Sequence, residues 1–166
     1  MAIKWVHDNA AFFGADPNKL TIAGQSAGGE SVLIHLSSPS NPVASMFSAA
    51  ISESGPLPMN FKYPPEARTL GRSFSIELGC PNLDDCECFH SKNTSQVLYA
   101  SDKVINIPFS MSDLFQQWAP VIDGSSIVQE PVAAFEKGQV VKVPLAGGMN
   151  SQGKKLFFIS PFSSNI

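Results

Sequence analysis

The stretch Leu20-Thr21-Ile22-Ala23-Gly24-Gln25-Ser26-Ala27-Gly28-Gly29 indicates the fold most directly. The apolar run 20–23 predicts a strand, and the residues from Ala27 onward predict a helix. Ser26 therefore stands at a sharp strand-to-helix turn, where the G-x-S-x-G pattern places a nucleophilic serine. We expect Gly24 and Gly28 to be glycines for steric reasons, because side chains two positions before and after the serine would collide in this turn.

The composition indicates a globular chain with the length of one domain. Its 166 residues are 43% hydrophobic and 15% charged. A net charge of −3 without a cluster of Lys or Arg argues against nucleic acid and against an anionic membrane as partners. No apolar run approaches the ~20 residues that a membrane span needs.

The first thirteen residues carry apolar side chains at helical spacing, which predicts an amphipathic, core-packing helix that ends near Gly14. They lack the basic start and continuous apolar core of a signal peptide.

Predicted strands and helices alternate along the rest of the chain. Two more apolar runs, 49–52 and 143–147, predict buried strands, and we expect the first to lie inside a sheet covered on both faces. The expected helices cover 27–36, 65–78, 96–101 and 131–137. This alternation predicts an α/β fold with a parallel sheet, although three strands alone would leave long unpaired edges. We interpret Asp123 as a turn former between Ile122 and Gly124.

Several further stretches resemble the carboxylesterase type B family, which includes cholinesterases and para-nitrobenzyl esterases. Besides the turn around Ser26, they are 2–6 with Asn9, 13–17, 51–55, 78–80, 88–92, 118–124 and 143–151. The resemblance covers about residues 2–158, in the family's order. It implies an incomplete carboxylesterase domain over 1–158 and an irregular tail over 159–166. The implied fold is a partial α/β-hydrolase fold, a mostly parallel sheet with flanking helices, truncated at both ends.

The resemblance implies a carboxylic ester hydrolase that forms an acyl-enzyme on Ser26, acts on a small-molecule ester and needs no cofactor. The backbone N–H of Ala27 is expected to be one arm of the oxyanion hole. The family's other arm comes from a glycine-rich loop upstream of this chain. Ser54 lies where the family keeps a serine near the site, so it either donates a supporting hydrogen bond or only turns the strand end. We expect Glu53 to be structural.

The acid position departs from the family's pattern. The family places a glutamate after the segment that corresponds to 148–152. Without a gap this position falls on Gly153, and with a shift of one residue it falls on Gln152. Neither side chain ionises, and the adjacent Lys154 and Lys155 disfavour an imidazolium nearby. The sequence therefore predicts a degenerate acid position.

A general base is also missing from the expected place. The histidine of α/β hydrolases follows the acid in the chain, whereas His7, His35 and His90 all precede residue 100. We therefore expect the chain alone to be nearly inactive. The alternative function is a non-catalytic, cholinesterase-like binding or structural protein with a protein partner. A lipase or thioesterase would share the turn but fits the other stretches less well.

Three cysteines, Cys80, Cys86 and Cys88, fall within nine residues. A zinc site is weakly supported, because no fourth ligand has suitable spacing although His90 is near, so we expect no metal. The family resemblance implies a Cys80–Cys88 disulfide, with Cys86 either free or a competing partner.

The sequence Asn93-Thr94-Ser95 is an N-glycosylation signal. Together with the disulfide, it favours a secreted or lumenal protein, although the chain carries no signal peptide of its own.

Overall fold

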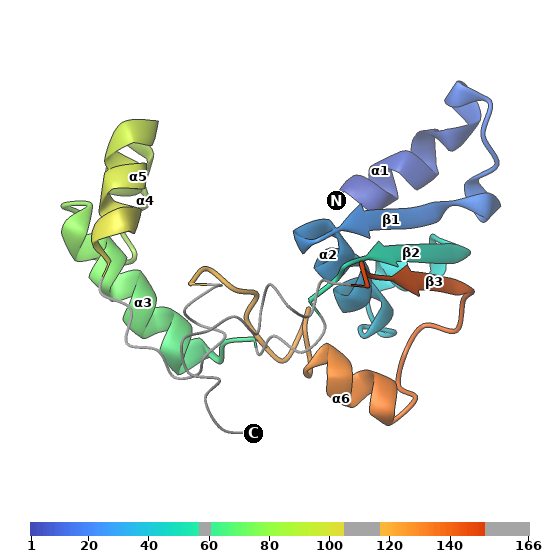
Figure 1. The fold of residues 1–166 in the computed structure, drawn as a ribbon. Helices are drawn as coiled ribbons and strands as arrows, with labels where there is room; N and C mark the ends of the chain where they lie inside the picture. Colours follow the sequence, from blue (N-terminus) through green and yellow to red (C-terminus); the bar gives the residue numbers. More distant parts are fainter. Residues whose placement is uncertain (57–60, 105–116, 152–166) are drawn as a thin grey trace, which may run out of the picture. The chain divides into compact units, whose positions relative to one another are not determined.

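The computed structural model describes residues 1–56, 61–104 and 117–151, which belong to two compact units (Figure 1). The first unit comprises the described residues of Met1–Pro58 and Gln129–Ile166. The second comprises those of Met59–Val128. The predicted boundary between the domain and the tail, after residue 158, lies outside the described residues and stays a prediction.

The first unit is built on a three-stranded parallel sheet. Its strands are β1 (Thr21–Gln25), β2 (Ala49–Glu53) and β3 (Leu145–Gly148), in the order β1-β2-β3. The register runs from Thr21↔Ala49 to Gln25↔Glu53 between the first two strands. Because all strands are parallel, their carboxyl ends lie at one edge of the sheet. The predicted α/β fold with a parallel sheet is confirmed.

Helices cover one face of this sheet. The main one is α2 (Ala27–Leu36), whose Leu33 and Leu36 form a core with Phe47 and Ala50. Helix α6 (Pro131–Glu136) adds Phe135 to the same cluster. Short 3-10 turns, Pro17–Lys19 and Pro42–Ser45, precede β1 and β2. The sheet therefore buries apolar side chains toward α2.

The other face of the sheet is open in the part of the chain that the structure describes, which corrects the expectation of strands covered on both faces. Ile51 points away from α2 and is 37% exposed, and all four residues of β3 are exposed. The apolar run 49–52 showed only that the strand could be covered on both faces. Burial also requires a partner surface, and the described residues place none over this face.

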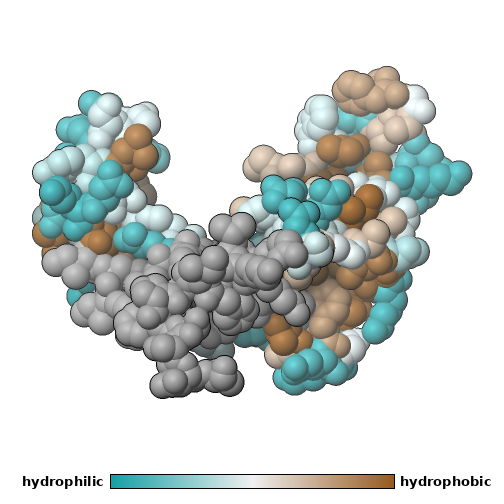
Figure 2. Space-filling view, in the orientation of Figure 1, coloured by the Kyte–Doolittle hydropathy of each residue, from teal (hydrophilic) through white to brown (hydrophobic). Residues whose placement is uncertain are grey.

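The N-terminal helix differs from its prediction in the same way. It consists of α1 (Ala2–Asn9) and the 3-10 turn Ala10–Phe13, and it ends at Gly14 (φ +71°) as expected. No residue of α1 is buried and Trp5 is 57% exposed, whereas Ala10 of the 3-10 turn is buried, so the expected packing into a core holds only for Ala10. Figure 2 shows hydrophobic residues at the surface over this segment. The helical spacing fixes which residues share a face, but it does not supply the surface that covers them.

The second unit is a small helical assembly. Helices α3 (Pro64–Glu77) and α5 (Thr94–Lys103) pack together, and α4 (Cys86–His90) lies between them in the chain. Its core contains Leu78, Cys80 and Ala100. The implied disulfide Cys80–Cys88 is present, and Cys86 is free and exposed.

Helix α5 begins two residues before its predicted start. Asn93 is its N-cap: its side chain accepts a hydrogen bond from the Gln96 N–H at 3.0 Å. The Gln96 side chain in turn accepts from the Asn93 N–H at 2.9 Å. This capping box satisfies N–H groups at the helix start and extends the helix beyond its apolar positions. In the described part of the chain, no helix has both the length and the apolar character to cross a membrane.

The turn around Asp123 confirms its interpretation as a turn former. One carboxylate oxygen, Oδ1, accepts hydrogen bonds from the N–H groups of Ser125, Ser126 and Ile127 at 2.9, 2.8 and 3.0 Å. Gly124 follows with φ +75°, a conformation that favours glycine. The backbone hydrogen bonds from Ile127 and Ser125 are the main causes that lower the pKa of Asp123 to about 2.

We expect this turn to open in strong acid. The pKa of Asp123 is lower in the folded chain than the ordinary value of 3.8, so the carboxylate stabilises the turn above pH 3.8. That stabilisation is lost as the pH falls through about 2. Amide exchange at Ser125–Ile127, corrected for intrinsic pH dependence, checks this. Asp123→Asn should remove the pH dependence, and an unchanged profile in that variant would show that another group causes it.

Candidate active site

Ser26 occupies a strained turn between β1 and α2. Its backbone has φ +54° and ψ −119°, in the region that residues with side chains rarely adopt. Its N–H donates to the carbonyl oxygen of Glu53 at 2.9 Å, which ties the turn to the end of β2. The predicted arrangement of strand, sharp turn and helix is confirmed. The residue itself is exposed, so its hydroxyl is accessible at the carboxyl edge of the sheet.

The two glycines of the motif differ in what they accommodate. A Cβ on Gly24 would lie 2.3 Å from both the carbonyl carbon and the oxygen of Gly28, so a side chain there is excluded. A Cβ on Gly28 would meet nothing within 4 Å, and the steric expectation for that residue is wrong. The close approach is between the Cβ position of residue 24 and the backbone of residue 28. Only the first of the two positions must lack a side chain.

Two glycines outside the predicted pair make the other close approach. A Cβ on Gly29 would lie 3.0 Å from both the Glu53 oxygen and the Gly55 Cα, and a Cβ on Gly55 would lie 2.5 Å from Ser52 Oγ. These contacts bring the first turn of α2 against the end of β2. Sequence reasoning missed both positions, because it assigned a steric role only to Gly24 and Gly28. The double glycine 28–29 was the available signal.

The first backbone N–H groups of α2 have no acceptor inside the helix. The first hydrogen bond inside the helix runs from the Glu30 N–H to the Ser26 oxygen at 2.9 Å. The N–H of Ala27 precedes it, at the positive end of the helix dipole. This geometry is compatible with an oxyanion donor, and the role of Ala27 stays a prediction.

Ser54 lies beside Ser26 at the same edge of the sheet. Each is the residue directly after its strand, and each has positive φ, +49° for Ser54. The Ser54 N–H donates to the oxygen of Gly148, the last residue of β3, at 2.7 Å. The Ser26 N–H donates in the same way to the oxygen of Glu53, the last residue of β2. The role of its hydroxyl stays a prediction. Glu53 contributes its carbonyl oxygen to the turn, in keeping with a structural role.

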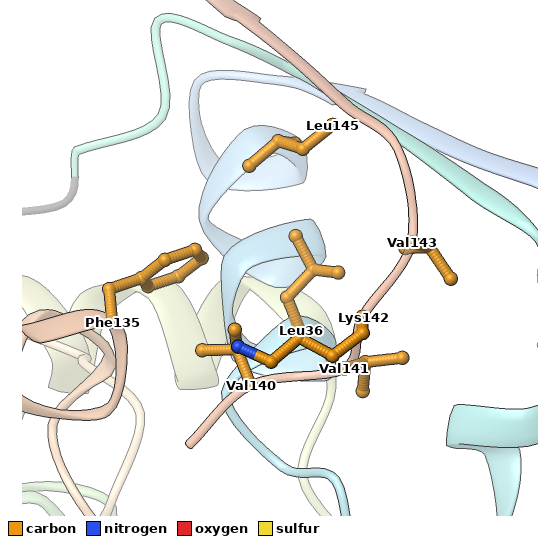
Figure 3. A pocket seen from close by; sticks show the side chains of 7 residues that line it. All are labelled: Leu36, Phe135, Val140, Val141, Lys142, Val143 and Leu145. Carbon is orange, nitrogen blue, oxygen red and sulfur yellow. The ribbon is translucent and has the colours of Figure 1, made fainter. Parts of the chain in front are cut away.

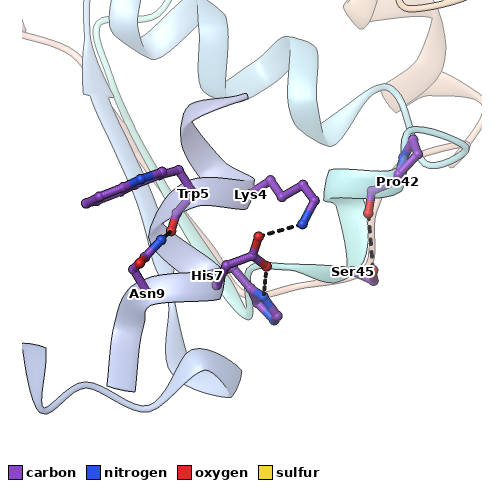
Figure 4. Close-up of polar contacts among 7 residues, drawn as sticks. Lys4, Trp5, His7, Asn9, Pro42 and Ser45 are labelled. Carbon is purple, nitrogen blue, oxygen red and sulfur yellow. Dashed lines mark hydrogen bonds and ion pairs between the residues drawn. The ribbon is translucent and has the colours of Figure 1, made fainter. Parts of the chain in front are cut away.

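The histidines lie in three different elements. His7 is in α1, where its Nδ1 lies 3.4 Å from Asp8 Oδ1, and Asp8 also pairs with Lys4 (Figure 4). His35 is in the last turn of α2, roughly 13 Å along the axis from Ser26, and burial lowers its pKa. His90 belongs to the second unit. The degenerate acid positions Gln152 and Gly153 lie outside the described residues.

A cavity of about 270 Å³ lies in the first unit, away from this turn. Its lining, drawn as sticks in Figure 3, is Leu36, Phe135, Val140, Val141, Lys142, Val143 and Leu145. Leu36 ends α2 and Leu145 begins β3, so the cavity lies at the end of the sheet opposite Ser26. Its lining contains neither a carboxylate nor a histidine that could assist the serine.

Comparison with known proteins assigns the chain to a family. The model of the carboxylesterase family matches residues 1–165. The chain belongs to the carboxylesterase family. Within it, the chain is 36% identical over 162 residues to the cAMP-regulated D2 protein of Dictyostelium discoideum, covering 97% of this chain and 30% of the relative. It is 31% identical to the cholinesterase of Mus musculus, covering 96% of this chain and 26% of that protein.

Solved carboxylesterase structures share the fold. A PNB esterase superimposes with a TM-score of 0.73 at 30% identity, over 98% of this chain and 33% of the esterase. A Geobacillus stearothermophilus carboxylesterase gives 0.73 at 29% identity, over 94% of this chain and 30% of that enzyme. The family resemblance and the partial α/β-hydrolase fold are thus confirmed. The chain spans about 30% of the length of the cAMP-regulated D2 protein and of the Crystal protein, both of Dictyostelium discoideum.

Proposed function

We propose that Ser26 is the nucleophile of a serine carboxylic ester hydrolase. The observation that carries the proposal is the strained turn of Ser26, whose N–H is fixed to Glu53 and whose approach to α2 requires Gly24. In this reaction Ser26 Oγ attacks the ester carbonyl carbon while a base takes the hydroxyl proton. The base then gives the proton to the leaving alcohol, and water hydrolyses the acyl-serine. The Ala27 N–H stabilises the oxyanion.

This chain supplies only part of that machinery. Its three histidines precede residue 100, and the expected acid position holds Gln152 or Gly153. In this proposal the base and the second oxyanion donor come from residues outside this chain, and the acid position within it holds no carboxylate. The substrate is a small-molecule ester, whose acyl and alcohol groups this segment does not define.

The test is ester hydrolysis by the polypeptide encoded by the complete transcript. We expect p-nitrophenyl butyrate to give a burst of p-nitrophenol equal to the enzyme concentration, followed by steady turnover. Ser26→Ala should abolish both. Ser31→Ala is the matched control, because that exposed serine of α2 bonds only the Ala27 oxygen, at 3.0 Å. Hydrolysis that survives Ser26→Ala would contradict the proposal.

A second candidate is a non-catalytic, cholinesterase-like binding or structural protein. The absence of a carboxylate at the acid position, with Lys154 and Lys155 beside Gln152 and Gly153, favours it. Such a protein would bind a protein partner. The complete transcript discriminates the two candidates: a glycine-rich loop upstream and a histidine downstream favour the enzyme, and their absence favours the binding protein.

We also place the protein in a secreted or lumenal compartment. The Cys80–Cys88 disulfide supports an oxidising environment. The glycosylation signal at Asn93 follows this disulfide in the same unit, and Asn93 is exposed.

We predict an N-linked glycan on Asn93 after expression through a secretory pathway. The Asn93 side chain caps α5 through its oxygen, which leaves the amide nitrogen for the sugar. Peptide N-glycosidase should shift the native chain on a gel, and Ser95→Ala should remove the shift while keeping the cap. Asn93→Gln should remove both the glycan and the cap, which costs about 1 kcal/mol of stability. A native chain that does not shift would refute the prediction.

A further inference from the structure

Ser52 is a buried polar residue on the face of β2 that meets α2. It is the last inward-facing residue of the strand, and only 6% of its surface is exposed. Its hydroxyl donates a hydrogen bond to the carbonyl oxygen of Gly29 at 3.2 Å. In an α-helix that carbonyl already accepts from the N–H four residues later, so the helix does not need the hydroxyl to satisfy it. The bond therefore links the first turn of α2 to β2 and adds little to the helix alone.

Two more links join the same two segments. The Ser26 N–H donates to the Glu53 oxygen at 2.9 Å, one residue along β2 from Ser52. The backbones of Gly29 and Gly55 are so close that a Cβ on Gly29 would lie 3.0 Å from the Gly55 Cα. Ser52 and Glu53 at the end of β2, and Gly55 just beyond it, thus all contact the segment that begins α2. Of these, Ser52 is the one that acts through a side chain.

We propose that Ser52 is a positioning residue for the turn that carries Ser26. Its hydroxyl fixes the first turn of α2 against β2, and this fixes the orientation of the Ala27 N–H at the carboxyl edge of the sheet. The catalytic consequence rests on the proposed ester hydrolysis. The positional consequence does not, because it concerns only hydrogen bonds present in this chain.

Amide hydrogen exchange on the full 166-residue chain tests the proposal without requiring turnover. Ser52→Ala removes the hydroxyl and leaves no buried donor without a partner, so the fold should persist. We expect exchange at the Ser26 and Glu30 amides to become about fivefold faster, the factor that one ordinary hydrogen bond contributes. Exchange at Ile22 and Leu36, away from the first turn of α2, should stay unchanged.

Two further variants test whether the effect is specific to the Ser52 hydrogen bond. Ser48→Ala removes a similar hydroxyl bond, from Ser48 Oγ to the Leu20 oxygen at 3.2 Å, at the other end of the β1–β2 pair. It should leave the Ser26 and Glu30 amides unchanged. Ser52→Cys keeps the shape of the side chain but donates only weakly, so it should resemble Ser52→Ala.

The outcomes separate a positioning role from a merely structural one. Faster exchange confined to Ser26 and Glu30 supports the proposal. An equal increase at Ile22 and Leu36 would mean that Ser52 serves only global stability, and no change would mean that it positions nothing. If Ser52→Cys exchanges as slowly as the native chain, side-chain packing and not the hydrogen bond protects the Ser26 and Glu30 amides. That result would also overturn the proposal. Loss of ester hydrolysis in Ser26→Ala is scored separately and does not enter this result.

Discussion

Gly24→Ala is expected to destabilise the chain by about 3 kcal/mol or more, the upper end of what overpacking costs. The added Cβ would lie 2.3 Å from the carbonyl carbon and oxygen of Gly28 and 2.8 Å from its Cα. All three atoms are backbone, so no side chain can rotate out of the way. Relief requires moving the start of α2 off β1, which breaks the turn around Ser26. Urea unfolding followed by circular dichroism measures the loss.

Gly28→Ala is the matched control for this prediction. The new methyl group would meet no atom within 4 Å, and residue 28 lies inside α2. Replacing a helical glycine by alanine normally stabilises by about 0.5–1 kcal/mol, so we expect no loss of stability. If both variants lose stability equally, the close approach between positions 24 and 28 is not the cause.

The 166-residue chain alone should hydrolyse p-nitrophenyl butyrate on the order of 10⁶-fold more slowly than a complete serine esterase. Loss of the general base of a triad has that effect, and loss of one oxyanion donor costs about 10²–10³-fold. The two losses do not add, because the parts act as a unit. Loss of the base is the larger effect, and it alone removes most of the rate enhancement.

In this isolated chain Ser26→Ala should change the rate by less than about twofold, because a serine without a base contributes little. Initial rates of p-nitrophenol release, with buffer alone as reference, measure both proteins. A burst equal to the chain concentration would contradict the prediction and would require a base within the 166 residues.

Local sequence signals predicted the elements well. The predicted strands and helices occur in the predicted order, because the apolar periodicity and the glycines that end helices act over a few residues. The short helix α4 (Cys86–His90) was not predicted. The start of α5 was placed two residues late, because the capping pair Asn93 and Gln96 is polar and adds no apolar repeat. The disulfide followed from the family resemblance and not from the spacing of Cys80, Cys86 and Cys88 alone.

Burial and close contacts were harder to predict. Trp5 and Ile51 were expected inside a core because they are apolar, yet the described residues place no surface over them. The motif around Ser26 predicted a tight turn. It did not indicate that a side chain would collide with the backbone at position 24 but not at position 28. Ser52 is one residue in an apolar run, and its bond to Gly29 depends on a segment 23 residues away. Such contacts arise from tertiary packing, which a local pattern does not specify.

Fluorophosphonate labelling followed by peptide mapping tests directly whether Ser26 is a nucleophile whose base lies outside this chain. We predict a stoichiometric adduct on Ser26 in the polypeptide of the complete transcript and no adduct in the 166-residue chain under the same conditions. Rapid labelling of Ser26 in the isolated chain, or an adduct on another residue of the complete polypeptide, would contradict the claim.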